Sequence, residues 1–242
     1  YKNGEGDISL SLKTSTIGSD YNYSAFSITA VNHNNIGRFK INTRTYAQLG
    51  NGENWAPESK LGLSGANNEE LMNSKFTSAA GIINRDMYEF GYSIGNFHSY
   101  GGLNIRGYSG YLAPEYDENG NLIANTNYGT SGASLTTEID FTSYLPYLLK
   151  KQGFNAYLFA DAGIINKEEV NANNISNAFA DIRADAGIGF TYTRRRWGAL
   201  ETIKPLIIRF DLPLFLNRPP YAEDGSDEYL KMRWLLGIGK TF

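Results

Sequence analysis

The most regular feature of the sequence is an alternation of apolar and polar residues from about residue 133 to the end. In 204–217 apolar side chains occupy every second position, opposite Arg209, Asp211 and Asn217. The segments 133–142, 154–165, 180–193 and 230–242 follow the same rule. Alternation with a period of two predicts β-strands with one apolar face and one polar face. In 204–217 the apolar face would consist of Leu206, Ile208, Phe210, Leu212, Leu214 and Leu216.

Three earlier segments, 7–16, 23–32 and 38–49, show a less apolar form of the same alternation. The sequence therefore predicts about eight strands, most of them long enough for a tilted membrane strand, which needs about 9 to 11 residues. Residues 50–132 lack clean alternation and far exceed an ordinary loop. We expect a long loop here, although 76–100 could hold further strands, with 87–94 as a candidate.

A soluble β-sandwich would also show alternation, with its apolar face turned inward and its charges in water. Its last strand, which carries Trp234, Leu236 and Ile238, would then need cover at the sheet edge. We favour an all-β fold, a transmembrane antiparallel β-barrel whose apolar rows contact lipid. Arg209, Asp211, Lys231 and Arg233 would then lie inside. A soluble β-sandwich that acts as a binding module remains an alternative.

Composition and charge narrow the classes of function. Apolar residues make up 41% of the chain and aromatic residues 14%, which suits strands. The net charge of −3 gives no basic field that would attract nucleic acid. The chain has no Cys, so disulfides and thiolate chemistry are excluded. No apolar run reaches the roughly 18 to 20 residues of a membrane helix, so a membrane would be crossed by strands.

No catalytic constellation is apparent. His33 and His98 are the only histidines, and neither has the spacing of a metal or catalytic site. Asp181 and Asp185 share one strand face with Arg183, and we interpret them as a row of lumen charges rather than as a site. The polar segment 116–121 lacks the terminal Glu of a calcium loop and is expected to be a solvated turn. We therefore predict no enzyme activity, no metal and no cofactor for this chain.

One ordered series of motifs is more specific than any single element. It begins with Gly-Gly-Leu-Asn-Ile-Arg-Gly-Tyr at 101–108 and continues through a strand that contains Glu138. Phe-Ala-Asp-Ala-Gly at 159–163, Ala-Asp-Ala-Gly-Ile-Gly-Phe at 184–190, Arg-Phe-Asp-Leu-Pro-Leu at 209–214 and a final Phe242 follow. Over residues 5–242 this series resembles the outer-membrane protein assembly factor superfamily. These surface-antigen barrels include the barrel-assembly insertase and the two-partner-secretion transporters.

The resemblance implies a sixteen-stranded barrel, of which residues 1–242 would form the C-terminal part with about the last eight strands. Residues 50–132 would be an extracellular loop that folds into the lumen. The loop motif, Arg106, Gly107 and Tyr108, would lock onto wall carboxylates that correspond to Glu138 and Asp161. The pattern agrees, because both acids fall on polar strand faces and an Arg fork can bind carboxylates through two hydrogen bonds.

The end of the chain matches part of the family's assembly signal for the terminal strand. Gly237 and Phe242 fit this signal, whereas Lys240 stands where the signal usually has an apolar residue. We expect the signal to remain recognisable to the insertion machinery.

The function implied by the resemblance is protein insertion or translocation through a gated barrel in the outer membrane of a Gram-negative bacterium. The expected partners are outer-membrane lipid, the N-terminal half of the same barrel, client outer-membrane or secreted proteins, and other envelope subunits. Alternatively, the barrel anchors a larger surface protein whose soluble domain, of the peptidase or lipase type, lies upstream. Client-binding periplasmic repeats upstream would favour the insertase, and a nucleophile elbow or a zinc motif would favour the anchor.

Overall fold

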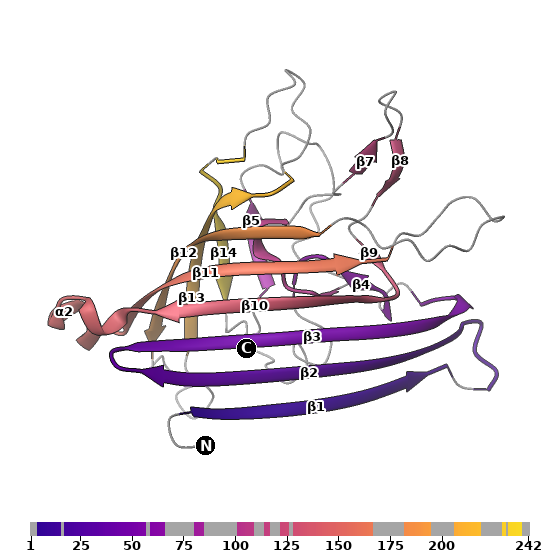
Figure 1. Ribbon diagram of the computed structural model, residues 1–242, viewed down its shortest axis with the longest axis horizontal. Helices are drawn as coiled ribbons and strands as arrows, with labels where there is room; N and C mark the ends of the chain where they lie inside the picture. The colour runs from indigo at the N-terminus through magenta and orange to yellow at the C-terminus, as the bar shows by residue number, and fades with distance from the viewer. Residues whose placement is uncertain are drawn as a thin grey trace.

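A nine-stranded antiparallel sheet forms the body of the protein in a computed structural model (Figure 1). The structure describes residues 4–15, 17–56, 59–65, 80–84, 101–108, 114–116, 122–125, 128–166, 182–194, 206–218, 229–230 and 232–238. The strands lie in the order β1-β2-β3-β10-β11-β12-β13-β14-β5. Their bounds are β1 Gly4–Thr14, β2 Asn22–Ile36, β3 Phe39–Asn54, β5 Ala80–Asn84, β10 Gly132–Asp140, β11 Phe154–Ile165, β12 Arg183–Arg194, β13 Leu206–Leu216 and β14 Leu235–Ile238.

The two faces of this sheet have opposite chemistry. The inner face, defined as the face against which residues 101–108 pack, carries buried charged and polar side chains. The opposite, outer face carries exposed apolar side chains. Residues that pair directly across neighbouring strands continue each face as rows of similar side chains. One apolar row, for example, runs from Ile139 to Leu158 and on to Ile188. The buried inner-face residues include Arg44, Thr136, Asp161, Arg183, Asp185, Arg209, Asp211 and Arg233.

Connections at the two ends of the sheet differ in length. At one end, here called the turn end, β2 and β3 join through Gly37 and Arg38, with Gly37 at a positive φ of 63° that glycine adopts readily. The same end holds the 3₁₀ turn η4 (Thr142–Tyr144) and the short helix α2 (Tyr147–Lys151) between β10 and β11. Residues 55–131 connect β3 to β10 at the other end, here called the loop end.

The all-β prediction is confirmed, and each of the eight segments predicted as strands contains one. Some bounds were wrong. The third strand continues to Asn54, so residues 50–54 belong to β3 and not to the loop. Of 230–242, only Leu235–Ile238 is a described strand, and Leu230 makes an isolated bridge to Phe215. Within 76–100, β5 pairs with β14, and the candidate 87–94 lies outside the described residues.

The prediction that Leu216 lies in the apolar row of its strand was wrong. Ala186 faces Phe215, whereas Gly187 faces Pro213, so Leu214 is an extra residue in β13. Such a bulge exchanges the two faces beyond it. Leu216 consequently lies on the inner face and is fully buried, while Phe215 is exposed. The remaining residues of this strand with a described side chain keep the predicted faces.

The long loop contains several short paired strands outside the large sheet. Its strand β4 (Leu61–Gly62) pairs in parallel with β6 (Gly101–Gly102) and antiparallel with β9 (Tyr128–Gly129). A second pair, β7 (Pro114–Tyr116) with β8 (Leu122–Asn125), lies further along the loop. The helices of the described residues include none long and apolar enough to cross a membrane.

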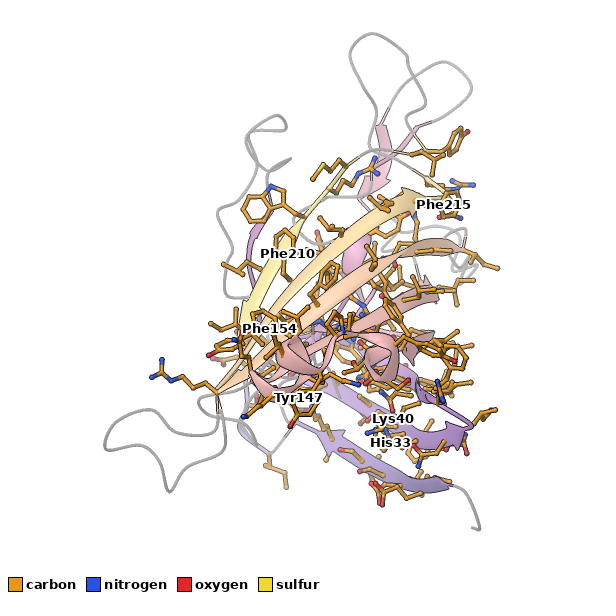
Figure 2. The ribbon with its side chains drawn as sticks, turned by 90° about the vertical axis from the view of Figure 1, so that its left-hand side faces the viewer. His33, Lys40, Tyr147, Phe154, Phe210 and Phe215 are labelled. Carbon is orange, nitrogen blue, oxygen red and sulfur yellow. The ribbon has the colours of Figure 1, made fainter. Side chains whose placement is uncertain are left out.

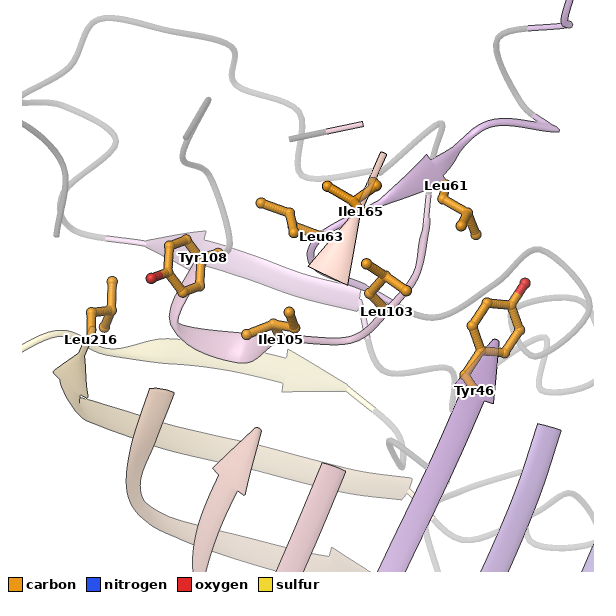
Figure 3. Packing of buried hydrophobic residues seen from close by; sticks show 8 residues of the cluster. All are labelled: Tyr46, Leu61, Leu63, Leu103, Ile105, Tyr108, Ile165 and Leu216. Carbon is orange, nitrogen blue, oxygen red and sulfur yellow. The ribbon is translucent and has the colours of Figure 1, made fainter. Parts of the chain in front are cut away.

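The buried apolar cluster lies between this loop and the inner face of the sheet (Figure 3). Leu61, Leu63, Leu103 and Ile105 come from the loop. They pack with side chains of the sheet and with Tyr108 of the 3₁₀ turn η3 (Arg106–Tyr108). The loop is therefore bound to the sheet by a core of its own. The sheet contributes Tyr46, Ile165 and Leu216 to this cluster.

Candidate functional site

The tip of the loop, residues 103–108, is positioned by backbone hydrogen bonds to the preceding arm of the same loop. The amide of Leu103 donates to the carbonyl of Gly62 over 3.2 Å, and the amide of Ile105 donates to the carbonyl of Leu63 over 2.8 Å. Asn104 between them has a positive φ of 56°, a conformation that Asn tolerates better than most residues. These bonds leave Arg106 directed at the sheet.

Arg106 binds two carboxylates of the inner face. Its Nε and Nη2 donate to the two oxygens of Asp161 over 2.7 and 2.9 Å. Its Nη1 donates to Oε1 of Glu138 over 2.8 Å. The guanidinium also lies over the ring of Phe159, 4.1 Å from its centroid. The contacts predicted for Arg106 with Glu138 and Asp161 are therefore present, and the Asp161 pair has the two-bond geometry that favours Arg over Lys.

The ion pairs continue along the inner face beyond Arg106. Glu138 Oε1 accepts a second hydrogen bond from Nη2 of Arg209 over 2.6 Å. Arg209 in turn donates through Nε to Asp211 over 2.6 Å. The hydroxyl of Tyr157 also donates to Asp211. Glu138 thus joins the loop arginine to an arginine of the sheet, and removal of either cation would leave this carboxylate with one partner fewer in a buried site.

Gly107 contacts a carboxylate that sequence reasoning did not assign to the site. Its backbone N–H donates to Oδ2 of Asp185. Asp185 lies directly opposite Asp161 in the pairing of β11 with β12, and like charges in that arrangement repel. Arg106 neutralises Asp161, and the Gly107 amide gives Asp185 a hydrogen-bond donor, so the tip supplies a partner to each of the two acids. The loop tip therefore stabilises an acidic pair of the sheet.

Gly107 is also held by close packing. A Cβ at this position would lie 2.8 Å from Cβ of Asp185 and 2.9 Å from Cδ1 of Leu216. We expect Gly107→Ala to displace the tip at a cost of about 1 to 3 kcal/mol, the usual range for overpacking. The displacement should appear as faster hydrogen exchange of the backbone amides of residues 103–108. Asp185→Asn keeps the acceptor and the shape and should have the smaller effect. Unchanged exchange in Gly107→Ala would contradict the close fit.

Tyr108 completes the site through its hydroxyl. The hydroxyl donates to Oδ1 of Asn217 over 2.8 Å and accepts from the amide of Arg218 over 3.2 Å. Asn217 is itself fixed by the amide of Ala184 and the carbonyl of Ile182. Burial raises the pKa of Tyr108 to about 12, so at neutral pH the phenol keeps the proton that it donates. Tyr108 thus attaches the tip to two residues that follow β13, and one of them, Asn217, connects to the start of β12.

The two carboxylates that Arg106 contacts maintain its positive charge. Burial alone would lower the pKa of Arg106, but Asp161 and Glu138 raise it well above the ordinary value, so the charge persists. Among the described residues no group of three metal-ligating side chains is present. The contacts of Arg106, Gly107 and Tyr108 attach the loop tip to the inner face.

The structure brings together the predicted site residues Arg106, Gly107, Tyr108, Glu138 and Asp161. Gly237 lies in β14 opposite Arg209, and Phe242 lies outside the described residues. Sequence reasoning missed the contacts of Asp185, Arg209 and Asn217. Asp185 and Arg209 were visible as inward charges of their strands, but alternation alone does not reveal which of them the loop reaches.

Comparison of the chain with protein-family models and with curated proteins finds no match.

Proposed function

We propose that the described sheet is part of a transmembrane β-barrel in the outer membrane of a Gram-negative bacterium, and that this barrel inserts or translocates proteins. In this proposal the barrel has sixteen strands, of which β1 to β3 and β10 to β14 are the last eight. β5, a segment of the loop, lies on the far edge of β14, and further strands complete the barrel beyond β1. The loop that carries Arg106 gates the lumen.

The chemistry of the outer face supports a lipid environment. Leu10, Leu135 and Leu158 expose 64%, 49% and 49% of their surface in the centre of apolar rows that cross the sheet. Soluble proteins rarely leave so continuous an apolar surface in water. The strands β1 to β3 and β10 to β13 also have the length that a tilted membrane strand requires, about 9 to 11 residues or more.

The inner face supports a gated lumen. A membrane barrel keeps its charged side chains inside, where water or protein solvates them. Here the loop tip covers those charges and binds Asp161 and Glu138 through Arg106. Passage of a chain through the lumen would require these ion pairs to open, so the attachment of the tip would control access. One observation carries the proposal: charged side chains lie on the inner face, where the loop tip binds them, and apolar side chains lie exposed on the outer face.

The test is a chromosomal Arg106→Ala substitution in the complete protein, followed by quantification of folded outer-membrane proteins and of secreted proteins. An insertase or translocator with an impaired gate should give reduced levels of its clients while its own strands remain assembled. The matched control is Lys13→Ala, which removes a positive charge from β1, outside the contacts of Arg106 and outside the turn end. If the envelope proteins are unchanged and only an upstream soluble domain is displaced, the barrel is a membrane anchor and the proposed function is wrong.

A further inference from the structure

The turn end of the sheet carries an exposed cluster of aromatic, leucine and basic residues that the proposed gate does not use. Helix α2 exposes 71% of Tyr147 and 70% of Leu148. Such large apolar side chains are normally turned inward in a helix that lies in water. Tyr144 of the preceding turn is also more than half exposed. The three side chains thus form an exposed apolar cluster at the turn end.

Aromatic rings connect this cluster to the apolar outer face. The ring of Tyr144 lies 5.3 Å from that of Phe39 at the start of β3. Phe154 at the start of β11 lies 4.9 Å from Tyr192 of the neighbouring strand. Figure 2 looks at this end of the sheet, with Tyr147 and Phe154 labelled. These rings form a band where the apolar rows end, and in membrane proteins Trp and Tyr gather at that level.

Basic residues border this aromatic band. Arg38, Lys150 and Lys151 are exposed, and Arg194 is exposed at the end of β12 on the outer face. The guanidinium of Arg38 lies 5.9 Å from the ring centroid of Tyr144, and Nζ of Lys150 donates to the carbonyl of Ser143 over 3.1 Å. The connection 141–153 contains no Asp or Glu.

The nearest acid along the chain is already engaged. Asp140, just before this connection, accepts a hydrogen bond from the amide of Thr142 over 2.7 Å. It also lies opposite Lys40 in the pairing of β10 with β3. The exposed charges that border the aromatic band are therefore positive. They complement an anionic surface at the edge of the apolar face.

We propose that the turn end is an interfacial anchor for anionic glycerophospholipid, a role that rests on the proposed membrane barrel. The headgroup level is occupied by the side chains of Tyr144, Tyr147 and Leu148. The apolar rows begin on the hydrocarbon side of this level. Arg38, Lys150 and Lys151 bind lipid phosphate, with their aliphatic stems along the aromatic band. The anchor fixes the depth of β3, β10 and β11, and with them the depth of the wall carboxylates that hold the loop.

The first test places a nitroxide at Leu148→Cys in a cysteine-free background of the complete protein, in vesicles of phosphatidylglycerol and phosphatidylcholine. Collision rates with oxygen and with a water-soluble nickel complex report depth. Label 148 should lie at the headgroup level, Leu158→Cys deep in the hydrocarbon and Ile17→Cys in water. A deep label 158 with an aqueous label 148 would overturn the anchor alone. An aqueous label 158 would overturn the membrane barrel itself.

The second test measures lipid selectivity with spin-labelled phosphatidylglycerol and phosphatidylcholine. Lys150→Gln and Lys151→Gln should each lower the preference for phosphatidylglycerol by roughly fivefold. Lys13→Gln, on the inner face toward the loop end, removes the same charge and should leave the preference unchanged. Equal preference in all three variants and in the parent would show that headgroup charge is not recognised here, and the proposed anchor would be wrong.

Discussion

Arg106→Ala is expected to release the loop tip from the inner face while the strands still form. The substitution leaves Asp161 without its two-bond partner and leaves Glu138 with Arg209 alone, in a site where the Arg106 and Asp161 side chains are 5% and 0% exposed. Removal of one member of a buried ion pair costs about 3 to 5 kcal/mol, because the remaining charge stays buried. Hydrogen exchange of residues 103–108 should accelerate by roughly 10²- to 5 × 10³-fold.

Two further variants test whether the missing ion pairs of Arg106 cause the faster exchange. Arg106→Lys keeps the charge but cannot form the two-bond fork, so it should fall between the parent and Arg106→Ala. Arg106→Ala combined with Asp161→Ala should cost less than the sum of the single substitutions, because neither charge is then left alone. Additive effects would show that the two residues do not interact, and the proposed lock would be wrong.

Leu158→Arg is expected to prevent or strongly weaken assembly in the membrane. Leu158 lies near the middle of β11 on the outer face, between Ile139 and Ile188 in the neighbouring strands. An Arg on the lipid face at the bilayer midplane costs about 2 to 4 kcal/mol, and this cost falls to about 0 to 1 kcal/mol near the interface. The free energy of unfolding from vesicles measures the difference.

Ile208→Arg is the matched control, because Ile208 lies on the same face but pairs with Tyr192 at the turn end. The control should be much better tolerated than Leu158→Arg. If both substitutions have the same small effect, the outer face does not contact hydrocarbon. A soluble sheet would have no gradient of cost with depth along the strand.

Much of the sheet could be predicted from the sequence because each strand carries its own signal. Period-two alternation depends only on neighbouring residues, so β10 to β13 were recognisable one by one. The inward direction of Glu138 and Asp161 followed from the same alternation. Their partner Arg106 was predicted only through the resemblance of an ordered series of motifs, since no local pattern links residue 106 to residue 161.

The features that sequence analysis missed depend on distant parts of the chain. The bulge at Leu214 is set by the pairing of β13 with β12, and it turned Leu216 into the inner core. The contact between Gly107 and Asp185 depends on where the loop meets the sheet. The parallel pairing of β4 with β6 joins segments of the loop that have no alternation of their own.

The most direct test of the proposed membrane barrel is a cysteine scan along β11, residues 154–165, in the complete protein in vesicles. Spin labels at 158, 160, 162 and 164 should collide with oxygen dissolved in the hydrocarbon. Labels at 157, 159, 161 and 163 should be shielded, because those side chains face the inner side and the bound loop. The alternation should hold at all eight of these positions. Even-numbered positions that are shielded by protein, or an absence of alternation, would contradict the proposed membrane barrel.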